Sequence, residues 1–437
     1  MPKSYCLPFA LAAAMLASAQ PAATPNVPQN LRCEYLTNPE AVDAIPPRLS
    51  WQPVSATRGA MQSAYSILVS RDPAAVAGDT WDSGRVATSQ FVNVPYAGKP
   101  LESGKTYYWK VRTWDNAGHE SGWSAVARFG IGLLNKSDWK GQWIAGGNAL
   151  RKEFSVAGKV VSAKIYVAAA GYYELRINGH KVGNHVLDPS YTPFAKRILY
   201  NAYDVTRALN SGGNAVALLL GEGWFGDRVA LVQLNIELEG GKKIEIVSDG
   251  SWQAGRSAIT ADSIYNGESY DARLEQPGWD QAGFTGEGWN AAAVKPAPTQ
   301  ALSAQAMPPI RALMEMTPKR MTSPKPGMFV YDLGQNFSGW VRMRASGPRG
   351  TVVKVRHSEL LYEDGTLNVE NLRGARATDT YTLKGEGEEV FEPHFTYHGF
   401  RYVEVTGCPG TPAMDSVQGR VVHSDVKPIG GFSSSKE

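Results

Sequence analysis

Cysteine is scarce in this chain, with only three residues among 437. Small extracellular scaffolds held together by disulfides have a much higher cysteine density, so that class of protein is excluded. Cys6 lies in an N-terminal apolar segment, which leaves Cys33 and Cys408 for the folded part. One long-range bridge between them is an alternative, but their separation in the sequence favours two free thiols.

An excess of one charge is also absent. The chain has 44 Lys and Arg residues against 41 Asp and Glu residues, and its formal net charge is +3. Binding to a polyanion needs a concentrated basic surface, because each phosphate contact is made by a positive side chain. We therefore expect no nucleic acid and no anionic membrane among the partners.

No apolar run is as long as the roughly 20 residues that span a bilayer. The N-terminus has Lys3, an apolar segment at 7–16 and small residues up to Ala19, which is the pattern of an export signal. A membrane anchor is the alternative, but the apolar segment is too short and no cysteine follows Ala19 to accept a lipid. We predict a signal peptide at 1–19 and a secreted or periplasmic protein that begins at Gln20.

Nucleotide and transition-metal motifs are missing as well. The segment 332–336 has a single glycine and does not open a helix, unlike a phosphate-binding loop. His357, His394 and His398 lie in predicted strands, without paired cysteines or a His-x-x-x-His helix. We therefore expect isolated histidines on strands or on the surface.

Short apolar and aromatic runs separated by turn residues are what the sequence does contain. After a flexible leader at 20–29, residues 30–134 have such runs, and the alternation around Tyr107 and Trp109 predicts a strand with a period of two. With an early strand Trp51, this region resembles a fibronectin type III module. Its aromatic side chains are expected in the core of a β-sandwich rather than on a ligand platform.

Two further β-rich modules follow, at 138–298 and 310–426. In the first of them, Asn178-Gly179 between alternating strands predicts a type I′ hairpin, and 204–209 predicts one or two helical turns with Asp204 as the cap. No long amphipathic helix is predicted. The expected fold class is all-β, with tandem β-sandwiches: a fibronectin type III-like module and two jelly-roll or β-sandwich modules.

Four motifs occur in a fixed order along the chain, namely 171–179 (GYYELRING) with 187–192 (LDPSYT), 219–225 (LLGEGWF), 267–273 (GESYDAR) with 277–279 (PGW), and 331–340 (YDLGQNFSGW). The third sandwich adds segments at 357–361 and 395–403. Together these segments resemble those of the bacterial α-L-rhamnosidases whose catalytic domain is an (α/α)6 barrel.

The resemblance implies that rhamnose-containing glycans are partners. The family inverts configuration with two carboxyl groups in the barrel, and the chain stops after 427–437, which resembles the start of that domain. We therefore expect the barrel to be missing, no catalytic residue to be present and the isolated chain to be inactive. Glu359, Glu363 and Asp364 are expected to belong to turns rather than to an acid-base pair.

One set of candidate ligands for a sugar lies in the third motif. Asn266, Glu268 and Tyr270 are on one side of an extended segment, and carboxylate, amide and aromatic groups suit sugar hydroxyls and the apolar sugar face. Asp271 stands next to Arg273. The alternative is that these two form a structural pair that braces a loop.

A second set lies in loops at strand ends, where binding residues concentrate. It consists of Asn178, Asn184, Asp188, Tyr191 and Trp224. The resemblance implies that this module can bind terminal L-rhamnose, in some members through calcium, and oxygen donors near Asn184 and Asp188 would suit that ion. A simple Asp-Pro turn is the alternative, and no other cofactor is expected.

Three functions are compatible with the sequence. The first is the non-catalytic N-terminal portion of a secreted α-L-rhamnosidase that carries carbohydrate-recognition and scaffold modules. The second is a free-standing rhamnose-binding lectin or adhesin, and the third is a spacer without a ligand. The ending at 427–437, within a segment that should open a helix, favours the first.

Overall fold

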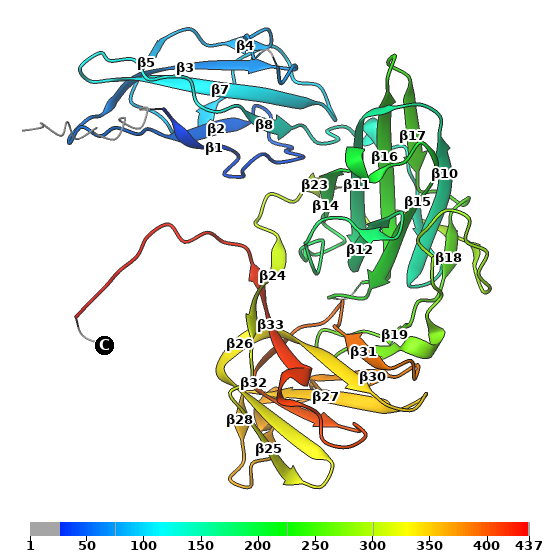
Figure 1. Cartoon of the computed structure of the whole chain (residues 1–437). Helices are drawn as coiled ribbons and strands as arrows, with labels where there is room; N and C mark the ends of the chain where they lie inside the picture. Colours follow the sequence, from blue (N-terminus) through cyan, green and yellow to red (C-terminus); the bar gives the residue numbers. More distant parts are fainter. Residues whose placement is uncertain (1–26, 75, 225, 300, 436–437) are drawn as a thin grey trace, which may run out of the picture.

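The computed structural model describes residues 27–74, 76–224, 226–299 and 301–435. The predicted signal peptide, with Cys6 and Ala19, lies outside the described residues. Figure 1 shows three β-rich bodies that follow one another along the chain, and the all-β prediction is confirmed. Within the described ranges, helical structure consists of short 3-10 turns, namely η1 (Lys136–Asp138), η2 (Thr206–Ala208), η3 (Ala272–Leu274), η4 (Glu370–Leu372) and η5 (Met414–Ser416).

The first body is a sandwich of a three-stranded and a five-stranded sheet. Trp51 and Trp109 are buried in its core, and Tyr107 and Val111 point to the same side as Trp109, so the predicted alternation is confirmed. One sheet has the order β1-β2-β6 and the other β4-β3-β7-β8 with β5 beside β3. The strands are β1 (Gln29–Cys33), β2 (Arg48–Gln52), β3 (Gln62–Ser70), β4 (Trp81–Asp82), β5 (Val86–Ala87), β6 (Val94–Pro95), β7 (Thr106–Asp115) and β8 (Ala127–Gly130).

The second body is a larger sandwich with sheet orders β13-β12-β15-β10-β18-β21 and β22-β9-β16-β11-β14-β23, with β17 beside β16. Its core lies between the two sheets. The strands are β9 (Trp143–Ala145), β10 (Ala149–Val156), β11 (Val160–Ala170), β12 (Tyr172–Ile177), β13 (His180–Lys181), β14 (Ile198–Asp204), β15 (Gly212–Gly221), β16 (Val229–Leu238), β17 (Lys243–Val247), β18 (Gln253–Gly255), β21 (Asn290–Ala291), β22 (Ala293–Lys295) and β23 (Leu302–Ala304).

Two local predictions for this body are confirmed. Asn178 and Gly179 both have positive φ, at 51° and 87°, and they join β12 to β13 in a tight hairpin. Such a turn requires positive φ at both central residues, which Asn and Gly tolerate best. The predicted helical segment is the single turn η2, but its N-cap is Val205 rather than the predicted Asp204, whose carboxylate accepts a hydrogen bond from the backbone nitrogen of Thr206 at 3.0 Å.

The third body is built on a ten-stranded sheet with the order β19-β20-β30-β27-β32-β26-β33-β24, in which β25 and β31 pair with β26. The predicted strands at 329–333 and 340–344 form one long strand, β26. The strands are β19 (Ile259–Ala261), β20 (Ser269–Asp271), β24 (Ile310–Met316), β25 (Arg320–Lys325), β26 (Met328–Ser346), β27 (Val352–Ser358), β30 (Thr378–Thr382), β31 (Glu388–Phe391), β32 (His398–Thr406) and β33 (Val417–Ser424), and a separate pair is formed by β28 (Leu360–Leu361) and β29 (Leu367–Asn368).

Strands β19 and β20 connect the second body to the third. They come from the sequence between β18 and β21 of the second sandwich, yet β20 pairs in parallel with β30 of the third sheet. The backbone nitrogens of Thr378 and Thr380 donate to the carbonyls of Asn266 and Glu268 at 3.0 and 2.8 Å. The second and third bodies therefore share a sheet edge, although the second module was delimited at 138–298.

Polar contacts also join the first body to the second. The carboxylate of Asp43 accepts hydrogen bonds from the hydroxyl of Tyr200 at 2.6 Å and from the backbone nitrogen of Ala304 at 2.5 Å. Burial raises the pKa of Asp43, although both donors act to lower it. Lys164 adds a hydrogen bond to the carbonyl of Glu40 at 3.0 Å.

Both cysteines of the folded part are free, as predicted. Cys33 is buried in the first sandwich, where burial raises the pKa of its thiol, and Cys408 is partly buried in the third. Across the residues described here, no helix combines the length and apolar character needed to cross a membrane.

Candidate functional site

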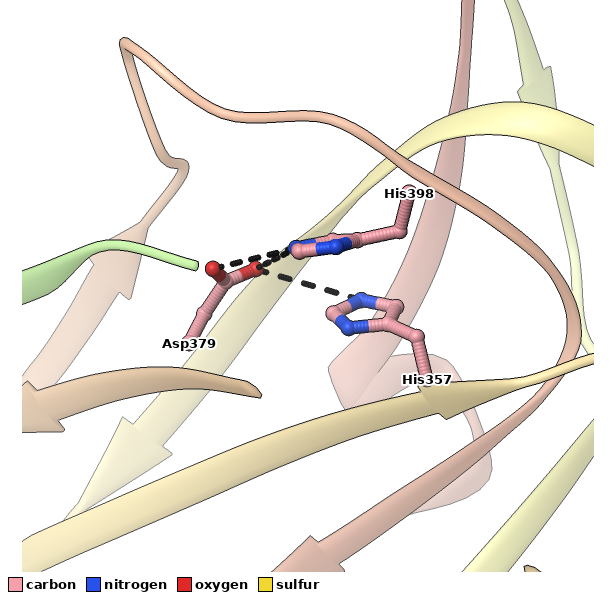
Figure 2. A group of neighbouring side chains, drawn as sticks. All are labelled: His357, Asp379 and His398. Carbon is pink, nitrogen blue, oxygen red and sulfur yellow. Dashed lines mark hydrogen bonds and ion pairs between the residues drawn. The ribbon is translucent and has the colours of Figure 1, made fainter. Parts of the chain in front are cut away.

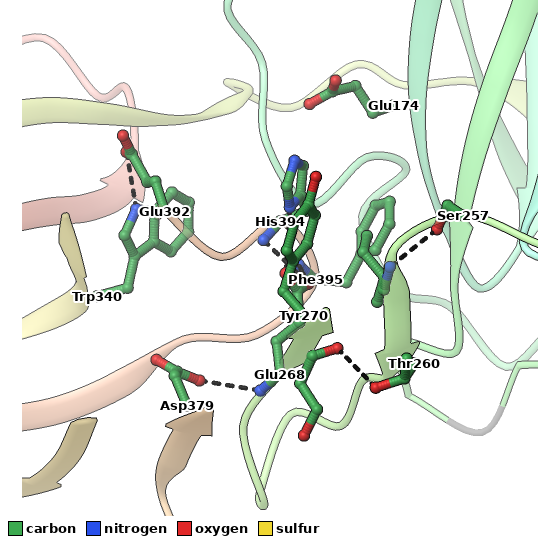
Figure 3. Close-up of polar contacts among 12 residues, drawn as sticks. Glu174, Ser257, Thr260, Glu268, Tyr270, Trp340, Asp379, Glu392, His394 and Phe395 are labelled. Carbon is green, nitrogen blue, oxygen red and sulfur yellow. Dashed lines mark hydrogen bonds and ion pairs between the residues drawn. The ribbon is translucent and has the colours of Figure 1, made fainter. Parts of the chain in front are cut away.

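Buried charged side chains gather where the second and third bodies meet (Figure 3). Glu268 stands directly before β20 and is fully buried. Its Oε2 accepts hydrogen bonds from the backbone nitrogens of His394 and Phe395 at 3.0 and 2.9 Å, and its Oε1 lies 3.1 Å from Nδ1 of His394. Glu268 therefore holds the 394–395 segment against the second body, and its predicted contact with a sugar is not supported.

Burial and the mutual contact shift the pKa values of Glu268 and His394. Loss of water raises the pKa of Glu268, while the contacts with His394 act to lower it. Burial alone would lower the pKa of His394, but the neighbouring carboxylate of Glu268 outweighs it and the pKa is raised. The pair is a buried, hydrogen-bonded contact between an imidazole and a carboxyl group.

A second carboxylate, Asp379 on β30, lies between two histidines (Figure 2). Nε2 of His398 is 3.2 Å from both carboxylate oxygens, and Nε2 of His357 is 3.9 Å from one of them. The two rings are stacked with centroids 4.1 Å apart. The prediction of isolated or surface histidines is wrong for these two residues, because pairing of β27 with β30 and β32 brings them together in the interior.

Electrostatics in this cluster follow the same physical causes. Burial, together with the nearby His398, lowers the pKa of His357 to about 3. Burial acts to raise the pKa of Asp379, yet the contact with His398 outweighs it and the pKa is lowered. The cluster therefore holds an ionised carboxylate beside at least one neutral imidazole ring.

Tyr270 borders a cavity of about 340 Å³ at the same joint. Its hydroxyl donates to Oε1 of Glu275 at 2.9 Å, and its ring is parallel to the ring of His394 at 6.2 Å. Trp279 and Trp289 also line the cavity and are stacked at 5.8 Å. The predicted Tyr270 is therefore near an opening, but its hydroxyl already has a partner in the protein.

Ion pairs order the polar wall of this cavity. Nε of Arg176 donates to Oδ2 of Asp280 at 2.6 Å, and its NH1 donates to Oε1 of Glu174 at 2.9 Å. Burial acts to raise the pKa of Glu174, but the charges of His394, Lys181 and Arg176 lower it to about 2. These groups are paired with one another, so they brace the joint.

Two of the predicted residues, Tyr191 and Trp224, meet at a separate recess of about 270 Å³. Their ring centroids are 6.4 Å apart, and Trp224 makes an edge contact with Tyr265 at 5.3 Å. Tyr191 is 44% exposed and Tyr265 is 57% exposed. Tyr397 of the third body also lines the recess, which therefore presents aromatic faces to solvent at the joint.

The structure separates the two predicted calcium ligands. Asn184 is exposed, whereas Asp188 is buried. The carboxylate of Asp188 lies 2.9 Å from Nδ1 of His185 and accepts hydrogen bonds from the hydroxyl of Tyr203 at 2.9 Å and from Gln305 at 3.4 Å. Asp188 thus does not offer the solvent-facing carboxylate that the calcium prediction requires.

Asn178 supports the hairpin rather than a ligand. Its amide donates to the carbonyl of Ala208 at 2.9 Å and to the side chain of Asn214 at 2.8 Å, and its oxygen accepts from the backbone of Ala215 at 2.8 Å. The side-chain amide is thus saturated with contacts inside the second sandwich.

The remaining candidates have local partners. Asp271 forms two side-chain hydrogen bonds with Arg273, at 2.9 and 2.7 Å, as in the structural alternative. Asn266 belongs to the turn before β20, and its side-chain oxygen accepts from the backbone of Arg376 at 3.4 Å. In the third body, Glu359 accepts hydrogen bonds from two asparagines, and Asp364 accepts them from Thr366 within the predicted turn.

Sequence reasoning missed the partners that lie far apart in the chain. Asp379 was not singled out, and nothing near it in the sequence distinguishes it from an ordinary strand residue. Trp289 was missed as well, although the motif with Trp279 points to this region. Only strand pairing reveals which of these side chains are neighbours.

Comparison with known families divides the chain into the same bodies. Residues 28–135 match the "Rha78A-like, N-terminal immunoglobulin domain", residues 158–314 match the "Alpha-L-rhamnosidase N-terminal domain", and residues 322–423 match the "Bacterial alpha-L-rhamnosidase concanavalin-like domain". The sandwich prediction for the first body is thereby confirmed as an immunoglobulin-type domain, while its assignment to fibronectin type III stays a prediction.

Two relatives whose sequences match most of this chain are α-L-rhamnosidases. The enzyme from Streptomyces avermitilis is 32% identical over 90% of the chain and 57% of its own length. One from Formosa agariphila is 34% identical over 92% of the chain and 48% of its own length. The chain therefore spans about half the length of the relatives that it matches.

Solved structures agree with this relationship. The α-L-rhamnosidase from Dictyoglumus thermophilum superimposes with a TM-score of 0.88 at 40% identity and covers 92% of this chain and 49% of its own. The S. avermitilis α-L-rhamnosidase, determined in complex with L-rhamnose, gives a TM-score of 0.87 at 30% identity and covers 91% and 57%. Over its three β-rich bodies, the chain belongs to the bacterial α-L-rhamnosidase family and consists of that family's N-terminal, non-catalytic modules.

Proposed function

We propose that the chain is the recognition and scaffold part of a secreted α-L-rhamnosidase and that it holds a terminal rhamnosyl residue of a glycan. The N-terminal segment 1–19 would direct export. The two catalytic carboxyl groups of an inverting glycosidase, about 6.5–9.5 Å apart, would be supplied by a barrel domain. On its own the chain would therefore bind without hydrolysis.

The observation that carries this proposal is the recess whose aromatic lining includes Tyr191, Trp224 and Tyr397, with Tyr265 in edge contact with Trp224. Rhamnose is a deoxysugar, so it has a methyl group and an apolar C–H face that pack well on aromatic rings. Polar groups for its hydroxyls are at hand, since Ser190 and Ser338 line the same recess. A relative determined in complex with L-rhamnose adds support from the family side.

The role of calcium in rhamnose binding is tested by experiment. The predicted pair of Asn184 and Asp188 has only one exposed member, so calcium binding there would require the buried carboxylate to leave its partners. Binding of L-rhamnose that is unchanged by a chelator is therefore the expected result. No observation favours the alternative of a free-standing lectin.

The test is a titration of the purified chain with L-rhamnose by calorimetry, with calcium and with a chelator. Trp224→Ala is expected to weaken binding about fivefold or more, because loss of an aromatic contact costs on the order of 1 kcal/mol or more and about 1.4 kcal/mol corresponds to tenfold. Phe91→Ala is the matched control, since Phe91 is an exposed aromatic residue of the first sandwich.

Hydrolysis of p-nitrophenyl α-L-rhamnoside is measured in parallel and is expected to stay at background. Turnover by the chain alone would contradict the assignment as non-catalytic. Equal binding by the Trp224→Ala variant and the parent chain would show that the sugar is held elsewhere.

A further inference from the structure

His357, Asp379 and His398 come from three strands that lie side by side. In the third sheet β30 pairs with β27, and β27 pairs with β32. The three side chains belong to residues that are separated by about 20 positions each, yet Figure 2 shows them converging on one point. The exposed fractions are 0% for His357, 1% for Asp379 and 5% for His398, so the cluster is sealed from solvent.

The donor atoms are close enough to share one ion. One ligand atom from each residue lies within 4.8 Å of the others. Two ligands bound to the same zinc at about 2.0–2.1 Å are roughly 3.3 Å apart in a tetrahedral site. The distances from Asp379 to Nε2 of His398 and of His357 are 3.2 and 3.9 Å, on either side of that value. Because the two imidazole rings are stacked, binding one ion would also require the rings to turn so that both nitrogen lone pairs point at it.

A buried nitrogen without a partner points into the same space. Nε2 of His357 has no hydrogen-bond partner, although the residue is fully buried. Its distance of 3.9 Å from the carboxylate of Asp379 is too long for a hydrogen bond. An orphaned buried polar atom costs about 1–3 kcal/mol, so the interior holds a group with an unmet need for a ligand.

The outer contacts orient the ligands as they do in metal sites. Nδ1 of His357 lies 3.1 Å from the carbonyl of Ala377, which assigns the proton to Nδ1 and leaves the lone pair on Nε2. Oδ1 of Asp379 accepts from the backbone nitrogen of Glu268 at 2.9 Å. A metal-bound histidine usually donates its other nitrogen to a carbonyl in this way, and bound carboxylates are themselves hydrogen-bonded.

We propose that Nε2 of His357, Nε2 of His398 and a carboxylate oxygen of Asp379 bind one zinc ion. Two imidazoles and one carboxylate suit a divalent transition metal, whereas calcium and magnesium prefer oxygen ligands. Water would complete the coordination. The ion would tie three adjacent strands together beside the joint with the second body, and its role is structural. This inference is independent of rhamnose binding.

The test uses the full chain without a polyhistidine tag, because a tag would bind zinc itself. After incubation with zinc and desalting, mass spectrometry of the metal is expected to give about one zinc per chain, and the melting temperature is expected to rise relative to chelator-treated protein. Cobalt substitution is expected to give the visible absorption of a tetrahedral nitrogen and oxygen site, without a thiolate charge-transfer band that Cys33 or Cys408 would produce.

His398→Gln and Asp379→Asn are expected to lower bound zinc at least tenfold. His119→Gln is the matched control, since its side chain is 80% exposed in the first sandwich, and it is expected to retain zinc fully. If the ligand variants do not fold, the cobalt spectrum of the parent chain decides. Zinc far below one per chain, or a cobalt spectrum dominated by thiolate, would overturn the proposal.

Discussion

Glu268 and Asp379 are both fully buried, and they lie at two paired strands, β20 and β30. Their surroundings differ. Glu268 receives two backbone hydrogen bonds and one contact from a histidine, so every side of the group is satisfied. Asp379 receives one backbone hydrogen bond, from Glu268, and one contact from His398, while Nε2 of His357 faces it at 3.9 Å and has no partner. When every polar atom of a buried cluster has a partner, the cluster is a structural brace. When one buried polar atom lacks a partner, the cluster can take a ligand.

The source of the partners adds to this contrast. The backbone nitrogens that bind Glu268 belong to His394 and Phe395, so the carboxylate fixes the course of the chain. Asp379 also accepts one backbone hydrogen bond, but two imidazole side chains face it, and imidazoles are metal ligands when neutral. Burial by itself therefore does not distinguish a brace from a site, and the count of satisfied atoms does.

The largest effect is expected from removal of the carboxylate of Glu268, which has a partner on each of its oxygens. Glu268→Ala leaves the backbone nitrogens of His394 and Phe395 without partners in the interior, and it is expected to lower the free energy of unfolding by about 3–5 kcal/mol. Urea denaturation followed by tryptophan fluorescence measures the loss. Glu363→Ala, in an exposed turn, serves as the control, and a loss below about 1 kcal/mol for Glu268→Ala would contradict the role of a brace.

A smaller, pH-dependent effect is expected for the histidine of the same pair. The pKa of His394 is raised in the folded chain, so its contribution to stability is complete below the ordinary value of 6.5 and is lost as the pH rises through the folded value. The difference in unfolding free energy between the parent chain and His394→Gln should therefore shrink as the pH rises above 6.5. A difference that stays constant with pH would contradict the raised pKa of His394.

The smallest effect is expected for a change at His357, which faces Asp379, when metal is absent. His357→Phe keeps the stack on His398 and removes the orphaned nitrogen, so in chelator it is expected to change the free energy of unfolding by less than about 1 kcal/mol. The carbonyl of Ala377 keeps the backbone hydrogen bond from residue 357. With zinc present, only the parent chain should gain stability. A loss above about 2 kcal/mol in chelator would show that the ring nitrogen has a partner after all.

Local signals made much of the fold predictable. The Asn178-Gly179 hairpin depends on two adjacent residues that tolerate positive φ, and the alternation around Trp109 depends on the period of a single strand. Fold class and the order of the three modules follow from such signals and from the family motifs. Residues 329–333 and 340–344 were predicted as two strands, and the structure joins them in the single strand β26.

The candidate site was less predictable, because its geometry depends on contacts between distant strands. Asp188 was predicted as a sugar or calcium ligand in a loop, but Tyr203 and Gln305 from other parts of the second body hydrogen-bond its buried carboxylate. His357 and His398 become neighbours only through the pairing of β27 with β32. Tyr191 and Trp224, predicted as sugar ligands in loops, lie together at a recess, and their contact with a sugar stays a prediction.

Strands β19 and β20 have a consequence for how such modules are exchanged in evolution. They are encoded within the second sandwich but complete the edge of the third sheet, and Glu268 travels with them. A recombination event that replaced the second sandwich alone would strip its neighbour of two strands and of a buried brace. We therefore expect the second and third bodies to be inherited together.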